Sequence, residues 1–404
     1  MVERDLYLQR LISLKDNSLI KVITGVRRCG KSTLLDMFKK HLISTGVKPE
    51  SIIHLNFESL EYDDIRDYIK LNEYIAGRIS ARCKKYILLD EVQMVFEWER
   101  AVNSLRLDNK LDIYITGSNG QLLASELSTL LSGRYVEVHM LPLSFREFLD
   151  FNGYGTSGDI NEYFNRYLEF GGMPGLTELR DNEIAIRSYL SGIYNTIILR
   201  DVIQRNEVRD PPLLENVMRF IAGSVGNQIS SKRISDYLTS SGRKTTSETV
   251  DNYLRMLESA YIIYRVGRYD LRGKQNLKTQ GKYYIVDAGI RSELVGNRGQ
   301  DYGFVLENIV YLELLRRGFT VKIGCIIGHE VDFIAVRHGK TVYYQVTATM
   351  MAEETREREL RPLKAIDDNY EKVILSMDRT PMSDYDGIRN LNLLDFLLGG
   401  VGTS

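Results

Sequence analysis

The 404-residue sequence has few cysteines and no excess of charge of either sign. Its three cysteines, Cys29, Cys83 and Cys325, are far apart and match no zinc-binding spacing. An odd, sparse set cannot form a disulfide framework, which favours a reducing compartment over secretion. Lysine and arginine total 53 and aspartate and glutamate 54, so a uniformly basic coat for nucleic acids is excluded, although a local basic patch is not.

Long apolar runs and an N-terminal signal are also missing. No run approaches the roughly 18 apolar residues that span a bilayer. The first ten residues, MVERDLYLQR, are charged and lack the apolar core of a signal peptide. Hydrophobic residues make up 43% of the chain, which is ordinary for a globular protein. We therefore expect a cytoplasmic protein with no membrane partner.

The pattern of apolar residues changes along the chain and predicts several domains. The first domain, residues 1–150, alternates apolar segments with amphipathic stretches, which predicts an α/β fold on a mainly parallel sheet. Its predicted strands are 19–24, 51–57, 86–90, 112–116 and 135–139. The later predicted domains are a helical linker or lid (151–210), a three-helix region with a ribbon (211–282) and a second α/β domain (283–404).

The strongest motif is Gly25-Val-Arg-Arg-Cys-Gly30-Lys31-Ser32, which fits G-x-x-x-x-G-K-[ST] in full. It follows an apolar strand pattern and opens a helical one, as a phosphate-binding loop requires. In such a loop, backbone N–H groups and the lysine hold phosphates, and the serine ligates Mg²⁺. We predict an N-terminal P-loop NTPase domain that binds ATP and Mg²⁺. The predicted binding residues are Gly25, Arg27, Arg28, Cys29, Gly30, Lys31, Ser32 and Thr33, with Ser32 also a metal ligand.

Two carboxylates, Asp90 and Glu91, end the apolar segment that begins at Tyr86. In P-loop enzymes such an aspartate supports Mg²⁺, and a following glutamate polarises the attacking water. Exposed acids at a strand end are common without any function, but a phosphate loop in the same domain favours the functional interpretation. We predict Asp90 as a metal residue and Glu91 as a catalytic residue.

A third apolar segment ends in Thr116, Ser118 and Asn119. Since parallel strands converge at their carboxyl ends, one of these side chains is expected at the γ-phosphate or the attacking water, and Asn119 is our catalytic candidate. Which of the three acts stays open. The alternative is that Ser118 or Asn119 caps a helix beginning near Gln121.

Arg134 comes directly before the last predicted strand of this domain. One interpretation is an arginine finger offered to the nucleotide of a neighbouring copy, which implies a homo-oligomer. The other is a cation that complements a helix dipole at its C-terminus. We include Arg134 among the predicted catalytic residues.

Four segments, GVRRCGKSTLL, YILLDEVQ, ITGSN and LLSGRYVEVHMLPLSFREFL, together resemble the prokaryotic AAA-superfamily ATPases that carry a C-terminal domain of unknown function. The segments FGGMPG, YNTIILRDVIQR and EVDF are similar to landmarks of that C-terminal part, so the resemblance covers nearly the whole chain. It implies Lys31, Asp90, Glu91, Asn119 and Arg134 in the roles given above. It does not imply a defined biological function.

Residues 211–282 resemble a winged helix-turn-helix: three predicted helices (214–225, 231–240 and 247–260) precede an apolar strand. The following ribbon is basic and suits phosphate contacts with double-stranded DNA. Its cations are Arg265, Arg268, Arg272, Lys274, Lys278 and Lys282. The third helix is acidic and poorly suited to enter a DNA groove, so a module that binds a protein partner stays open.

Acidic residues in the last domain are similar to the core of restriction-endonuclease-like domains. Glu307 lies on a predicted helix, and Glu330 and Asp332 share one face of a predicted strand. Active members hold Mg²⁺ with a further acid and a lysine on the next strand. Here Gln345 and Thr347 stand at those two places, so we expect a degenerate nuclease-like domain without cleavage activity.

The predicted function is a Mg²⁺-dependent ATPase of the AAA superfamily. Hydrolysis to ADP and phosphate would drive conformational change and engagement of DNA or protein by the C-terminal half. The alternative is a nucleotide-gated binding module for DNA or protein, with little turnover.

Overall fold

The computed structural model describes residues 4–79, 84–118, 131–155, 158–180, 182–296, 301–326, 328–379 and 383–399. The chain forms two compact units, which are treated separately below. Unit 1 comprises Met1–Pro142 with Ser259–Tyr261, and unit 2 comprises Leu143–Glu258 with Ile262–Ser404. Within the described residues, no helix combines the length and apolar character needed to cross a membrane.

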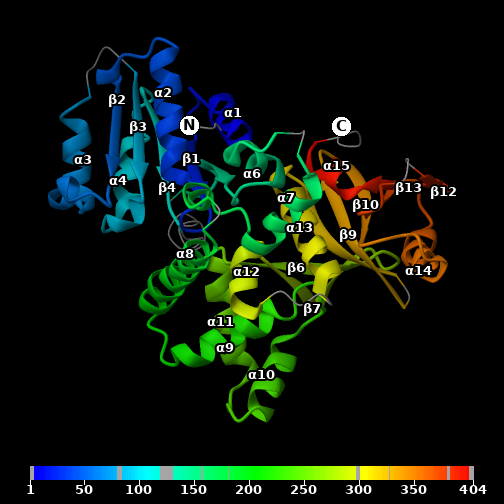
Figure 1. The fold of residues 1–404 in the computed structure, drawn as a ribbon. Coiled ribbons are helices and arrows are strands. Elements are labelled where there is room, and N and C mark those ends of the chain that lie inside the picture. The colour runs from blue at the N-terminus through cyan, green and yellow to red at the C-terminus, as the bar shows by residue number, and fades with distance from the viewer. Residues whose placement is uncertain are drawn as a thin grey trace. The chain divides into compact units, whose positions relative to one another are not determined.

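Unit 1 is built on a five-stranded sheet with the order β2-β3-β4-β1-β5, and every neighbouring pair is parallel (Figure 1). Its strands are β1 (Ile20–Thr24), β2 (Ile52–Asn56), β3 (Lys85–Asp90), β4 (Leu111–Thr116) and β5 (Tyr135–His139). Each lies within one residue of its predicted bounds, and the predicted α/β class of this domain is confirmed. The central strands β1, β3 and β4 are buried at every position, as expected of a parallel sheet covered on both faces.

Helices and helical turns connect these strands. They are α1 (Asp5–Ser13), α2 (Lys31–Ser44), η1 (Pro49–Ser51), η2 (Leu60–Ile65), α3 (Tyr68–Ala76), η3 (Val92–Met94) and α4 (Trp98–Leu105). Trp98, the only tryptophan of the chain, is buried in the core of this unit. Most of the helix predicted near residue 121 falls outside the described residues.

Unit 2 begins with helices and ends in a large sheet. Its helical elements before the sheet are α6 (Phe145–Asn152), α7 (Ile160–Phe170), η5 (Pro174–Glu178), α8 (Glu183–Thr196), the π-helix η6 (Ile197–Gln204), α9 (Pro211–Ala222), α10 (Ser231–Ser240) and α11 (Ser247–Ser259). The later helices are α12 (Ala288–Val295), α13 (Tyr302–Arg316), α14 (Glu353–Lys364) and α15 (Leu393–Leu397). The three helices predicted between residues 214 and 260 are therefore present as α9, α10 and α11.

The sheet of unit 2 has eight strands in the order β12-β13-β11-β10-β9-β8-β6-β7. They are β6 (Ile263–Asp270), β7 (Gln275–Ile285), β8 (Thr320–Ile326), β9 (His329–Arg337), β10 (Lys340–Thr347), β11 (Glu371–Ser376), β12 (Ser383–Tyr385) and β13 (Ile388–Asn392). Phe333 of β9 packs near Tyr311 of α13, while Ile334 joins Leu363 of α14 in one apolar cluster. Helices therefore cover both faces of this sheet.

The ribbon β6–β7 belongs to this large sheet rather than to a separate wing. β6 pairs in parallel with β8, from Arg268 opposite Ile323 to Asp270 opposite Cys325. The predicted domain boundary at residue 282 consequently falls inside β7. The physical reason is burial: Tyr284 of β7 stacks on Tyr311 of α13, with ring centroids 4.5 Å apart, so the ribbon completes the core of the C-terminal sheet.

The FGGMPG segment is a tight turn held by one buried carboxylate. Asp287 accepts hydrogen bonds from the N–H groups of Gly172 (2.7 Å), Gly289 (2.9 Å) and Ile290 (3.1 Å). Gly171 has φ +77°, and a β-carbon there would lie 2.1 Å from Asp287 Oδ1. Burial raises the pKa of Asp287 to about 6, although the three N–H donors oppose that shift. Glycine is thus required where this turn approaches α12.

Candidate nucleotide site

The predicted phosphate loop connects β1 to α2 and depends on glycine at both ends. Gly25 has φ +142°, and a β-carbon there would lie 2.1 Å from the backbone oxygen of Met140. Gly30 is the N-cap of α2 and has φ +103°, in the left-handed region that favours glycine. The loop therefore ends at the N-terminus of a 14-residue helix, where backbone N–H groups and the helix dipole favour an anion.

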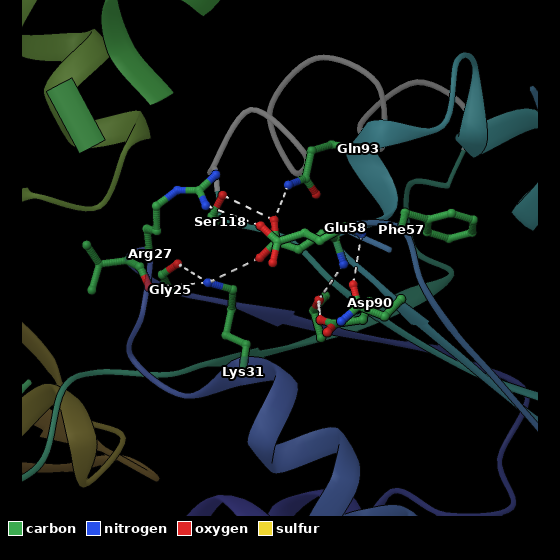
Figure 2. A network of polar contacts seen from close by, with 12 residues as sticks. Gly25, Arg27, Lys31, Phe57, Glu58, Asp90, Gln93 and Ser118 are labelled. Atoms are coloured by element: carbon green, nitrogen blue, oxygen red, sulfur yellow. Dashed lines mark hydrogen bonds and ion pairs between the residues drawn. The ribbon is translucent and has the colours of Figure 1, made fainter. Parts of the chain in front are cut away.

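Lys31 and Glu91 face one another across this loop. Figure 2 shows Lys31 beside Gly25. The Lys31 ammonium donates to the carbonyls of Gly25 (3.0 Å) and Val26 (3.2 Å), and lies 3.9 Å from Glu91 Oε1. Both side chains are buried, with Lys31 4% and Glu91 7% exposed. The cation and the carboxylate that the sequence predicted for phosphate binding and for catalysis are thus neighbours.

Asp90 ends β3 and is tied to the loop. Its Oδ1 accepts a hydrogen bond from the Thr116 hydroxyl (2.5 Å), and the Ser32 side chain lies close enough to this carboxylate to act on its pKa. Burial raises the pKa of Asp90, and the polar side chains of Thr116 and Ser32 oppose that rise. Ser32 and Asp90 therefore offer adjacent oxygens, which are the ligands that Mg²⁺ prefers.

Glu91 is held in an unusual backbone conformation by its neighbours. It has φ +54°, a left-handed value that is uncommon for residues other than glycine, and its N–H donates to Thr116 Oγ1 (2.9 Å). Its carboxylate accepts from Gln93 Nε2 and, at 3.4 Å, from Ser118 Oγ. Among the three polar residues predicted at the end of β4, Thr116 therefore hydrogen-bonds to both acidic residues, and Ser118 contacts Glu91. Asn119 lies outside the described residues.

Sequence reasoning missed two residues of this site, Gln93 and Arg4. The Arg4 guanidinium is 3% exposed and donates to the carbonyls of Cys29 (3.0 Å), Leu141 (2.9 Å) and Pro142 (3.2 Å). It thereby supports the back of the phosphate loop from a position far away in sequence. Gln93 stands two residues after Glu91, within the YILLDEVQ segment, and only the turn η3 brings its amide back to the carboxylate.

The other predicted binding residues of the phosphate loop differ in exposure. Arg27 pairs with Glu58 (3.4 Å), which follows β2, as Figure 2 shows. Arg28 and Thr33 are exposed, whereas the Cys29 side chain is fully buried. Burial raises the pKa of the Cys29 thiol. We therefore assign Cys29 a packing role beneath the loop, and its backbone remains part of the predicted binding set.

Arg134 lies apart from the side chains grouped around the phosphate loop. It precedes β5, and its carbonyl accepts from the N–H of Ile20 (3.0 Å) at the start of β1. Because β1 and β5 are parallel, Arg134 lies at the amino-terminal edge of the sheet, opposite the edge that carries the phosphate loop. Its side chain is exposed and contacts Asn103 Oδ1 (3.2 Å). The Arg134 side chain therefore lies away from the candidate nucleotide site of its own chain.

A second polar cluster in unit 2 surrounds Lys282. The ammonium lies 2.7 Å from Glu307 Oε1, 2.6 Å from Glu330 Oε1 and 3.6 Å from Asp332 Oδ1. Burial lowers the pKa of Lys282, but the carboxylates of Glu307, Asp332 and Glu330 outweigh it and hold that pKa above its usual value. The three acids predicted for a nuclease-like core therefore do lie together, with a lysine among them.

This arrangement corrects the prediction for Lys282, which we placed in a basic stripe facing DNA. The side chain is 4% exposed because it neutralises buried carboxylates. Gln345 instead accepts from the N–H of Asp332 (3.3 Å) and donates to Glu359 (2.8 Å), and Thr347 donates to the carbonyl of Thr349. In the described part of the chain, no group of three or more His, Cys, Asp or Glu residues is arranged to hold a metal ion.

Comparisons with known proteins agree with the class that the fold and loop define. A family model described as an AAA domain matches residues 17–149, and a model of a domain of unknown function matches residues 161–301. The chain carries a P-loop AAA-type domain and a separate domain of unknown function.

Two relatives define its family more closely. The chain is 41% identical over 400 residues to an uncharacterized protein of Haemophilus influenzae, covering 98% of this chain and 99% of that protein. It is 31% identical over 374 residues to an uncharacterized protein of Methanocaldococcus jannaschii, covering 88% and 78%. The chain belongs to the family of these two proteins. The solved structure of the Aeropyrum pernix ORC1 protein in complex with DNA is 13% identical, with a TM-score of 0.32, and covers 73% of this chain and 92% of that chain.

Proposed function

We propose that unit 1 binds ATP with Mg²⁺ and hydrolyses it to ADP and phosphate. The observation that carries this proposal is the convergence of Lys31, Ser32, Asp90 and Glu91 at the carboxyl edge of one parallel sheet. Ser32 and Asp90 provide the oxygen atoms for Mg²⁺, directly or through water. Bound Mg²⁺ would neutralise charge that develops between the β- and γ-phosphates.

The Lys31–Glu91 pair suggests how nucleotide binding prepares the catalytic base. The Lys31 ammonium contacts two loop carbonyls and faces Glu91 at 3.9 Å. A bound γ-phosphate would compete for that ammonium because it carries more negative charge than a single carboxylate. Glu91 then keeps only its contacts with Gln93 and Ser118, and its carboxylate is available to orient the attacking water and accept its proton.

Steady-state phosphate release with Mg²⁺-ATP tests this assignment. Lys31→Ala is expected to lose both binding of a fluorescent ATP analogue and turnover. Glu91→Gln keeps the binding, while its turnover falls by about 10²–10³-fold, within the usual range for losing a general base. Glu97→Gln is the matched control, because this half-buried acid pairs with Arg100 outside the site. Hydrolysis at the wild-type rate by Glu91→Gln would refute the base assignment.

We infer further that hydrolysis drives conformational change and controls engagement of DNA or protein by the C-terminal half. The helix order α9, α10 and α11 favours a helix-turn-helix-like module for that contact, although the ribbon β6–β7 that follows is part of the C-terminal sheet. The alternative is a nucleotide-gated binding module with little turnover. A burst of one phosphate per chain, followed by slow release and tight partner capture in the ATP state, would favour that alternative.

We also propose a cytoplasmic protein in which Arg134 acts on the nucleotide of a neighbouring copy. The position of Arg134 at the sheet edge opposite its own phosphate loop supports a role in trans. The free thiols of Cys29 and Cys325 fit a reducing compartment. The nuclease-like core is proposed to be inactive, since the Lys282 ammonium lies among the carboxylates that would otherwise ligate Mg²⁺.

A further inference from the structure

A groove of about 1150 Å³ lies within unit 2, between the turn of the β6–β7 ribbon and the segment that follows α14. Its floor is formed by the sheet, including Ile334 and Tyr343. The nucleotide site and the Lys282 cluster contribute none of its lining residues. The volume exceeds what a single water or ion needs and is ample for a ligand of nucleotide size.

One wall of the groove is basic and its charges are available. Arg272 and Lys274 are exposed in the ribbon, and Lys322 projects from β8. The Lys322 ammonium donates to Asn276 Oδ1 (2.9 Å) and lies 4.8 Å from the centre of the Tyr269 ring. Among the described residues, no carboxylate lies within ion-pair distance of any of these three cations. The positive charges of these three side chains are therefore all available to attract an anionic ligand.

The opposite wall offers an exposed aromatic ring held in place. The Tyr370 side chain is 52% exposed, and its ring centroid lies 6.2 Å from that of Tyr343. Asp368 accepts from the Tyr343 hydroxyl (2.7 Å) and from the N–H of Tyr370 (3.1 Å), so both its oxygens are occupied. Asp367 is the remaining acid of this wall. The groove thus combines cations on one side with a fixed, solvent-facing aromatic surface on the other.

We propose that this groove binds a segment of unpaired nucleic acid. Phosphates would contact Arg272, Lys274 and Lys322, and a base would stack on Tyr370, the combination by which single strands are held without sequence preference. A duplex fits less well because its bases already stack on one another and leave no face for the tyrosine. This inference rests on the proposed function in one respect: it names a nucleic-acid partner for the ATPase. The binding itself needs none of the residues of the nucleotide site.

Fluorescence anisotropy with oligothymidylate and oligouridylate of about 12 nucleotides, against a duplex of equal length, tests the proposal. The wild-type full-length protein should bind one or both single strands more tightly than the duplex at low salt. Tyr370→Ala should weaken binding about tenfold, and Tyr370→Phe should retain it, because stacking needs the ring and not the hydroxyl.

Salt dependence separates the basic wall from the tyrosine. Each of Arg272→Ala and Lys322→Ala should reduce the slope of log affinity against log salt by about 0.7, the value for one phosphate contact on a single strand. Lys70→Ala is the matched control, an exposed lysine of α3 in unit 1 whose loss should leave both affinity and slope unchanged. Far-UV circular dichroism of each variant verifies that it is folded.

Three results would overturn the inference: no binding of single strands, equal binding of the duplex, or wild-type affinity in Tyr370→Ala. ATP hydrolysis is measured on the same preparations and should be unaffected by Tyr370→Ala. Strand binding without ATP hydrolysis in the wild type would refute the proposed function and leave the groove assignment standing. ATP hydrolysis without strand binding would refute the groove assignment and leave the proposed function standing.

Discussion

Replacing Lys282 with methionine should destabilise unit 2 strongly and in a pH-dependent way. Methionine fills a similar volume but leaves the carboxylates of Glu307, Glu330 and Asp332 without their cation. Removing one partner of a buried ion pair costs about 3–5 kcal/mol of unfolding free energy. A carboxylate left without its cation can take up a proton, which costs about 4.4 kcal/mol at about pH 7.5 for a carboxyl of ordinary pKa. This cost sets an upper limit on the unfolding free energy lost for each such acid.

The pH dependence of this loss gives the test its specificity. Lys282 has a raised pKa, so in the wild type its stabilising contribution is complete at every pH below the usual lysine value and is lost only in strong alkali. In the variant, burial and mutual repulsion raise the pKa of Glu307 and Asp332 further, so acid relieves the penalty. We expect the difference from wild type to shrink by about 1.4 kcal/mol per pH unit for each additional proton taken up.

Urea denaturation followed by far-UV circular dichroism measures the effect at about pH 7.5 and about pH 5.5. Fluorescence of Trp98 reports unit 1 alone and is the internal control. Lys274→Met is the matched variant, because it removes an exposed lysine of the same ribbon and should change stability by less than about 0.5 kcal/mol. A loss below about 1 kcal/mol for Lys282→Met, or an equal loss at both pH values, would refute the assigned role.

Three further outcomes are expected. Gln93→Ala should lower the ATP hydrolysis rate with little change in ATP affinity, because Gln93 positions the Glu91 carboxylate and not the phosphates; an affinity loss without a rate loss would contradict this. Arg4→Met should weaken binding of an ATP analogue by leaving buried loop carbonyls unpaired, and unchanged binding would dismiss Arg4 as a support. Gly171→Ala should cost more than about 2 kcal/mol of unfolding free energy through its clash with Asp287, whereas Gly133→Ala, also at positive φ but in open space, should cost about 1 kcal/mol.

The parts of unit 1 that could be predicted from the sequence are those with a strictly local signal. Apolar segments ending in Asp90 or Thr116 predicted the strands, and parallel strands bring their ends to one edge whatever the loops do. Gln93 and Arg4 escaped prediction because their roles depend on tertiary geometry: a left-handed turn at Glu91 and a contact across 25 residues or more.

Unit 2 shows how a one-dimensional charge pattern can mislead. Lys282 and Arg272 belonged to the same predicted basic stripe, yet the alternation along β7 turns Lys282 and Tyr284 toward Glu307 in the core. Arg272 remains exposed near the ribbon turn. Glu330 and Asp332 were found by their spacing on one strand, but their cation comes from a strand about 50 residues earlier, which no local spacing rule encodes.

The opposite placement of Arg134 and the phosphate loop has a consequence for symmetry. If the finger of one copy enters the site of the next, contacts run head to tail, and copies must close into a ring or extend as a filament rather than pair about a two-fold axis. Two variants that are each inactive should then regain ATP hydrolysis when they are mixed. Arg134→Ala keeps an intact phosphate loop, Lys31→Ala keeps its arginine, and in an equal mixture about a quarter of the junctions join the two intact halves, so about a quarter of the wild-type turnover should return.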